Sequence, residues 1–172
     1  MRLSNKVKGI ILRYSIILII SLFYPILNAI LAIPTTRASY FIISLFYPAS
    51  ILGNIISFNG IQIELIDACI AGLAYLLLIV LNLAVEMPLK TRIRALSFTI
   101  LVFFAFNVFR ITKLALMFSS GSEYFSYLHA FFWYFGSIVL VFLIWLLTLK
   151  IFKIKENPFL SDITFLMKKT KN

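Results

Sequence analysis

Three residues of this chain carry the chemical groups that thiol-based acyl transfer requires. Cys69 is the only cysteine, His129 is the only histidine, and Arg110 interrupts the apolar stretch 103–117. A thiolate can attack a carbonyl carbon, an imidazole can move protons, and a guanidinium can stabilise an oxyanion. Asn107 precedes Arg110 by three residues, so on a helix the two share a face. The residue types predict a cysteine nucleophile site if the fold brings them together.

Each of these residues also has a simpler interpretation. A lone membrane cysteine often packs as a small apolar side chain, and an arginine near a helix end can extend to lipid headgroups. His129 lies in the aromatic segment 127–134, which is typical of a membrane interface. One cysteine and one histidine without a carboxylate cluster do not make a zinc site, so we expect no metal and no cofactor.

The composition indicates an integral membrane protein. The 172 residues are 62% hydrophobic and only 13% charged, and the mean hydropathy is +1.04. Lipid forces the backbone to satisfy its own hydrogen bonds, and long apolar blocks favour helices over the alternating pattern of a barrel. The net charge of +10 does not predict a nucleic-acid partner, because the basic residues lie at the ends of apolar runs. We therefore expect an all-α, polytopic membrane bundle.

Four segments reach the length of about 20 residues that a membrane span needs, namely 10–31, 68–85, 95–117 and 126–149. We interpret the first as a membrane anchor rather than a removed signal peptide. Segment 40–58 is apolar but contains Pro48, Gly53 and Asn54, which favours an interfacial or re-entrant helix. Asn59-Gly60 predicts a β-hairpin after it, so helix and hairpin together occupy 40–66. The whole chain, 1–172, is expected to form one transmembrane domain with a tail at 150–172.

The basic residues predict the orientation of these spans. All of the 16 lysines and arginines except Arg37, Arg110 and Lys113 lie near the N-terminus, at 90–94 or after 149. Four spans place these three regions on one side, which the positive-inside rule makes cytoplasmic. We expect a multi-pass protein of the cell membrane with both termini cytoplasmic.

The same topology places the candidate site at the extracytoplasmic face. There it brings Cys69, Arg110 and His129 to one depth, on three successive spans. Asp67 is expected to be the N-cap of the second span, with Cys69 in the first helical turn. In that position the helix dipole favours the thiolate.

Three motifs together resemble the exosortase/archaeosortase superfamily over residues 54–145. They are Asp67-Ala68-Cys69-Ile70-Ala71-Gly72, then Asn107-Val108-Phe109-Arg110-Ile111, then His129 with Gly136 downstream. Family members show an acidic-Ala-Cys-small-Gly segment, an Asn-x-x-Arg motif and a later His or Arg in this order. The chain departs from the family at Ile70 and Ala71, where Ser or Thr and then Gly are frequent. In size and pattern the chain resembles a small archaeosortase-like form of this superfamily.

The resemblance implies a membrane cysteine transpeptidase or protease. Cys69 would form a thioester with the substrate, His129 would act as general acid and base, and Arg110 would stabilise thiolate and oxyanion. Asn107 and Asp67 would support them. The implied partners are surface proteins with a C-terminal sorting motif, a transmembrane helix and a basic end, and the implied acceptor is an amine such as a membrane lipid headgroup.

Two functions of other classes stay open at this point. A non-enzymatic membrane interaction subunit would use these polar residues only to pack helices, so Cys69→Ser would be nearly silent. A small anion transporter could bind its substrate with Arg110 and Lys113, although no inverted repeat supports it.

Overall fold

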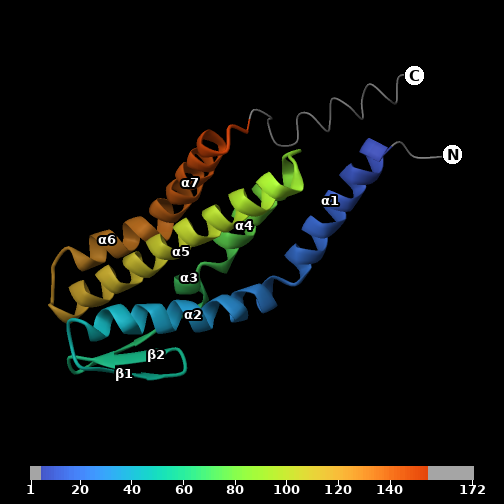
Figure 1. Cartoon of the computed structure of the whole chain (residues 1–172). Helices are drawn as coiled ribbons and strands as arrows, with labels where there is room; N and C mark the ends of the chain where they lie inside the picture. The colour runs from blue at the N-terminus through green and yellow to red at the C-terminus, as the bar shows by residue number, and fades with distance from the viewer. Residues whose placement is uncertain (1–4, 155–172) are drawn as a thin grey trace.

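The computed structural model describes residues 5–154, which form a helical bundle with one small sheet (Figure 1). The helices are α1 Asn5–Leu22, α2 Tyr24–Ser44, α3 Asp67–Ile70, α4 Gly72–Ala84, α5 Leu89–Ser119, α6 Phe125–Phe131, the π-helix η1 Phe132–Gly136, and α7 Ser137–Ile151. The strands are β1 Ala49–Leu52, β2 Ile55–Phe58 and β3 Ile61–Glu64.

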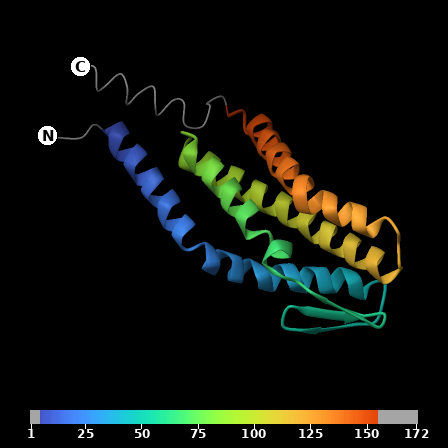
Figure 2. The same cartoon turned by 180° about the vertical axis from the view of Figure 1, so that it is seen from behind.

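Four helical segments of the described part are long and apolar enough to cross a membrane. They are Tyr24–Ser44, Asp67–Ala84, Leu89–Ser119 and Phe125–Ile151. The start of α1, the α4–α5 connection and the end of α7 lie at one end of the bundle, while the sheet and the α5–α6 connection lie at the other (Figures 1 and 2). The predicted polytopic helical membrane fold is therefore confirmed.

The first span differs from the predicted segment 10–31, because the helix is interrupted at Phe23, between α1 and α2. Pro25 occupies the first turn of α2, where a missing N–H costs nothing, but it cannot continue a helix that comes from α1. The segment that qualifies as a span is α2 itself, and it extends to Ser44.

The expected interfacial helix over 40–58 is wrong, while the hairpin that was expected after it is confirmed. Residues 49–58 form two strands of an antiparallel sheet with the order β1-β2-β3. Pro48 follows the end of α2, and Gly53 has a φ of +60°, which allows a tight turn into β2. Asn59 and Gly60 both have positive φ, as the predicted type I′ turn requires, and they pair Phe58 with Ile61.

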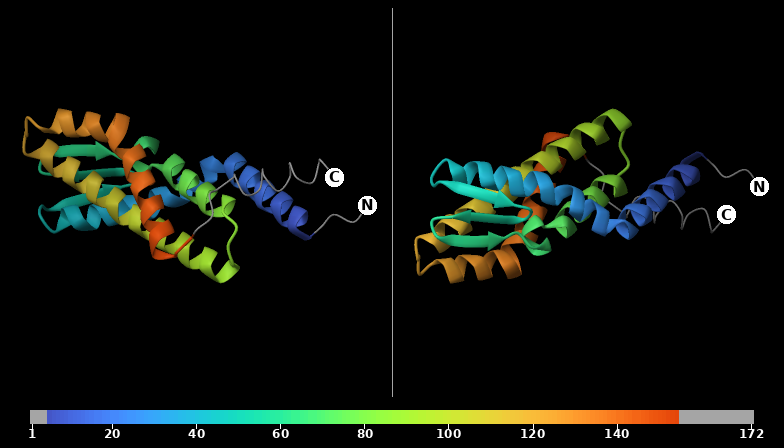
Figure 3. Two further views of the ribbon diagram at one scale, coloured as in Figure 1. Left: turned by 90° about the horizontal axis from the view of Figure 1, so that it is seen from above. Right: turned by 90° about the horizontal axis from the view of Figure 1, so that it is seen from below.

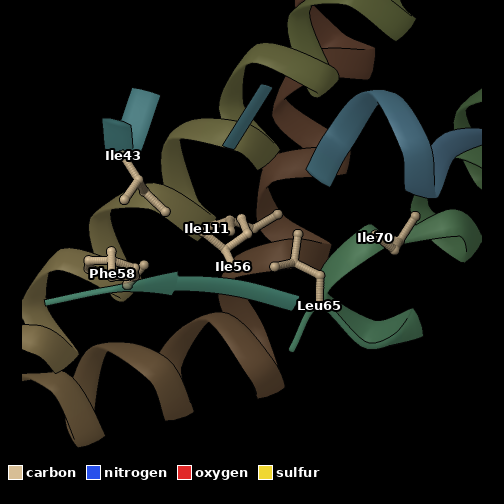
Figure 4. Close-up of a cluster of buried hydrophobic side chains, with 7 residues drawn as sticks. Ile43, Ile56, Phe58, Leu65, Ile70 and Ile111 are labelled. Carbon is tan, nitrogen blue, oxygen red and sulfur yellow. The ribbon is translucent and has the colours of Figure 1, made fainter. Parts of the chain in front are cut away.

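One face of the sheet packs against α2 and α5 and holds the chain that leads into α3. The buried cluster that does this consists of Ile43, Ile56, Phe58, Leu65, Ile70, Ile111 and Ala115 (Figure 4). A second cluster joins α4, α5 and α7 and includes the edge-to-face pair Tyr75 and Phe103, whose ring centroids are 4.7 Å apart. Leu65 and Ile70 flank Cys69 in sequence, so the first cluster fixes the backbone on both sides of the cysteine.

Candidate active site

Cys69 lies on a four-residue helix that ends abruptly at Ala71. Ala71 has a φ of 61°, a left-handed conformation that costs an alanine about 1–2 kcal/mol. Its carbonyl accepts the N–H of Ala74 at 2.9 Å, so α4 begins anew after the break. The predicted continuous helix 68–85 is therefore interrupted, and the carbonyls of Ala68, Cys69 and Ile70 are left available to other donors.

Side chains of α5 bind these carbonyls. The Nδ2 of Asn107 donates to the carbonyls of Cys69 at 3.0 Å and Ile70 at 3.2 Å, and Asn107 is 2% exposed. The Nη2 of Arg110 donates to the carbonyls of Cys69 at 3.2 Å and Ala68 at 3.4 Å. The three-residue spacing of Asn107 and Arg110 thus lets one helix face hold the main chain of the cysteine segment, and both side chains bind the Cys69 carbonyl.

The other terminal nitrogen of the Arg110 guanidinium is held by Ser137, the first residue of α7, which directly follows η1. The Nη1 of Arg110 donates to Ser137 Oγ at 2.9 Å, and Ser137 Oγ donates to the Phe132 carbonyl at 2.8 Å. The latter bond spans five residues, which matches the wider turn of a π-helix. π-Bulges are frequent at functional sites, and here η1 supplies the Phe132 carbonyl that binds the Ser137 hydroxyl, which in turn accepts from Arg110.

His129 lies on α6 and its side chain is exposed. It lines the same cavity as residues of α5 and β3. Its ring stacks on Phe125, with centroids 5.4 Å apart and an interplanar angle of 6°, and it also contacts Trp133 at 6.1 Å. Among the described residues, no hydrogen bond joins the imidazole to Cys69 or Arg110. Aromatic stacking, rather than a polar partner, orients His129.

Cys69, Arg110 and His129 line one cavity of about 360 Å³. Its walls come from β3 and the chain after it, from α5, and from α6 with η1. A second cavity of about 510 Å³ lies on the other side of Arg110, between the start of α2, α4 and α7, and shares Ala68, Arg110, Phe132 and Trp133 with the first. Cys69, Arg110 and His129, which the sequence indicated, therefore line the same cavity. Arg110 lies between this cavity and the second one, whose lining is largely apolar.

The predicted role of Asp67 as an N-cap is wrong. The cap position belongs to Ile66, without a side-chain hydrogen bond, and its carbonyl accepts the N–H of Cys69 at 2.8 Å. The Asp67 carboxylate instead accepts a 2.8 Å hydrogen bond from Nδ2 of Asn28 on α2. Asn28 is 5% exposed. The Asp67 carboxylate thus bonds to a helix distant in sequence instead of to the backbone N–H groups of its own helix.

The contact between α2 and α4 yields a prediction about Gly72. A Cβ atom at Gly72 would overlap the Asn28 side chain, whose Cγ would lie only 3.0 Å away. Gly72→Ala must therefore displace Asn28 and its bond to Asp67, with an expected destabilisation of about 1–3 kcal/mol. Resistance to unfolding in mixed micelles of a mild detergent and dodecyl sulfate would measure the loss.

Gly9→Ala is the matched control for that variant. No described atom lies within 4 Å of a Cβ at Gly9, and alanine favours the helix, so this variant should be as stable as the parent or slightly more so. Equal stabilities for the two variants would contradict the close contact at Gly72.

Sequence reasoning missed two polar residues that hold the site in place. The sequence did not reveal the partner of Asn28, because that partner is 39 positions away. It did not reveal the partners of Ser137, because these depend on the π-helical turn before it. Both are single polar side chains in apolar segments of the chain, where a polar group needs a partner, and that pattern could have drawn attention to them.

Comparison with known proteins yields one match to a protein family. The family of transmembrane exosortases matches residues 8–149, which is most of the chain and includes every residue of the candidate site named above. No curated protein matches the chain, and no solved structure matches it. The match begins inside α1 and ends inside α7, and so it covers three of the four candidate spans completely and all but the last two residues of the fourth. The chain belongs to the transmembrane exosortase family.

Proposed function

We propose that this exosortase-family protein is a cysteine transpeptidase that removes the C-terminal sorting helix of surface proteins. The observation that carries the proposal is the shared cavity of Cys69, Arg110 and His129. A cysteine that served only to pack helices would have no need of a cavity lined by both a cation and an imidazole. Family membership supports the same class of reaction.

The first half of the reaction forms a thioester. The Cys69 thiolate adds to the carbonyl carbon of a substrate peptide bond, and the resulting oxyanion is stabilised by the positive charge of Arg110. His129 gives a proton to the leaving nitrogen as the carbon–nitrogen bond breaks. The C-terminal fragment with its transmembrane helix departs, and the rest of the substrate remains bound to the sulfur.

The second half regenerates the enzyme. An amine attacks the thioester carbon, His129 takes a proton from that amine, and the carbon–sulfur bond breaks to restore the thiolate. A membrane lipid headgroup is the acceptor that we propose, because it brings an amine to the depth of the cavity. The product is then a surface protein with a lipid anchor in place of its helix.

Substrates are identified by comparing cells with and without the chain. Mass spectrometry of membrane proteins should find a small set whose C-terminal helix persists only when the chain is missing. These proteins should share a short motif before one transmembrane helix with a basic end. Unchanged C-termini across all membrane proteins would contradict the proposed function.

The proposal places the cavity at the extracytoplasmic face, which cysteine labelling tests. In the Cys69→Ser background, Ser120→Cys marks the α5–α6 end and Lys90→Cys marks the α4–α5 end of the bundle; both positions are exposed. A membrane-impermeant maleimide should label Ser120→Cys in intact cells and Lys90→Cys only after permeabilisation. The reverse result would show that the orientation is wrong.

A further inference from the structure

Strand β3 leaves one edge of the small sheet open. The sheet order β1-β2-β3 places β2 in the middle, so β1 and β3 are its edges. Phe58 and Ile61 flank a two-residue turn, which makes them a hydrogen-bonded pair, and pairing alternates from there along the strands. The bond from Leu65 N–H to the Asn54 carbonyl, at 2.9 Å, follows the same alternation.

This alternation assigns a direction to each backbone group of β3. Residues Ile61, Ile63 and Leu65 direct their N–H and C=O groups toward β2. Gln62 and Glu64 direct theirs to the open edge, where the described residues provide no strand partner. These groups recur every second residue, about 6.8 Å apart, which is the spacing of matching groups on another extended chain.

The open edge borders the cavity that contains the cysteine. Five consecutive residues, Gln62 to Ile66, line this cavity, whereas none of its lining residues comes from β1 or β2. Phe125 and His129 of α6 line the same cavity. Seen from above or below, the sheet projects between α2 and α6 (Figure 3), while Figure 1 shows it below α2. The chain continues from β3 directly to Cys69, which also lines the cavity.

We propose that β3 binds the substrate by strand addition, with the residues next to the scissile bond extended along Gln62 and Glu64. The proposal rests on the proposed function and adds how the substrate is recognised. The outward N–H and C=O groups of β3, at a two-residue spacing, complement the main chain of an extended substrate. A helical substrate could not bind them in this way, because its own N–H and C=O groups bond to each other within the helix. The substrate's transmembrane segment must therefore be preceded by an extended stretch, which a strand at the cavity wall would hold beside the sulfur.

Peptide electrophiles test this docking without knowledge of the natural substrate. The probe is acetyl-Ala-Val-Ala-Val with a C-terminal vinyl sulfone, and the reference is ethyl vinyl sulfone. In both probes the Cys69 thiolate adds to the vinyl carbon β to the sulfone, the carbon–carbon double bond becomes a single bond, and the carbon next to the sulfone takes a proton from water. Mass spectrometry of the purified full chain measures both rates. Strand addition should make the peptide react at least about tenfold faster than the reference.

N-methylation of the peptide, one residue at a time, tests the alternation itself. Methyl groups on alternate nitrogens should remove the rate advantage, and methyl groups on the nitrogens between them should leave it intact. The loss should follow a period of two along the peptide. A flat profile, or a loss that simply grows toward the sulfone, would overturn strand addition.

Two proline variants provide the matched comparison on the protein. Gln62→Pro removes an N–H that faces the open edge without removing a bond to β2. It should abolish the peptide's advantage, measured as the ratio of the peptide rate to the ethyl vinyl sulfone rate in the same variant. Ile51→Pro removes the equivalent outward N–H on the opposite edge of the same sheet and should keep the advantage. Equal effects of the two variants, or no advantage for any peptide in the parent chain, would overturn the proposal.

The same experiments distinguish this inference from the proposed function. If native processing depends on Cys69 but the methylation profile is flat, the transpeptidase stands and strand addition fails. If the profile alternates but no membrane protein changes its C-terminus, strand addition stands and the transpeptidase fails. Crosslinking of Gln62→Cys to the same residue of a second copy in membranes would show that the edge binds another molecule of this protein instead, and would overturn the proposal.

Discussion

Cells that carry Cys69→Ala in place of the parent chain should accumulate substrates that keep their C-terminal helices, with processing reduced on the order of 10⁴-fold or more. The variant removes the nucleophile and little else. The contacts that hold this segment use the main chain: Asn107 and Arg110 bind the Cys69 carbonyl, and the Cys69 N–H binds Ile66. Pulse-chase analysis of a substrate identified in the comparison of cells would measure the rate.

Cys69→Ser separates a catalytic sulfur from a packing role. The hydroxyl nearly matches the thiol in size but is a far weaker nucleophile at neutral pH, so processing should fall almost as far as with alanine. Both variants should insert and accumulate like the parent, which quantitative immunoblotting of membranes would check. Processing within tenfold of the parent in Cys69→Ser would refute the role of Cys69 as nucleophile and favour the interaction-subunit alternative.

Local signals predicted the hairpin and the helical class because both depend on neighbouring residues. Asn59-Gly60 determines its own turn whatever surrounds it, and the apolar blocks require helices wherever lipid surrounds them. The error at the first span was of a different kind. Pro25 was visible in the sequence as a helix-breaking residue, and more weight on it would have moved the boundary to Phe23.

The internal arrangement of the site depends on contacts between distant segments, which one sequence does not reveal. Asp67 was expected to cap its own helix, but its carboxylate binds Asn28 from another span. Topology alone brought Cys69, Arg110 and His129 to the same end of the bundle, and the structure places all three on one cavity. The break at Ala71 had no local signal, since alanine normally continues a helix; it coincides with the carbonyls that Asn107 and Arg110 bind.

Arg110→Lys should reduce processing by about 10²–10³-fold although the charge is retained. The guanidinium bridges two partners with different nitrogens, Ser137 through Nη1 and the Cys69 carbonyl through Nη2. A single ammonium group on a flexible chain lacks the planar fork that reaches both, so its charge would not be fixed beside the sulfur.

The effect of Arg110→Lys can be separated from a general loss of structure. Ser137→Ala removes only the hydroxyl that orients Nη1, and it should lower processing by about tenfold with the chain still stable. In a substrate-saturation assay with a peptide from an identified substrate, both variants should lower kcat more than they raise KM, because Arg110 acts on the oxyanion and not on the bound peptide. A rise in KM alone would assign Arg110 to substrate binding. Parent-like kinetics in Arg110→Lys would show that a positive charge suffices without the geometry of the guanidinium. The orientation of Arg110 by Ser137 would then not contribute to catalysis.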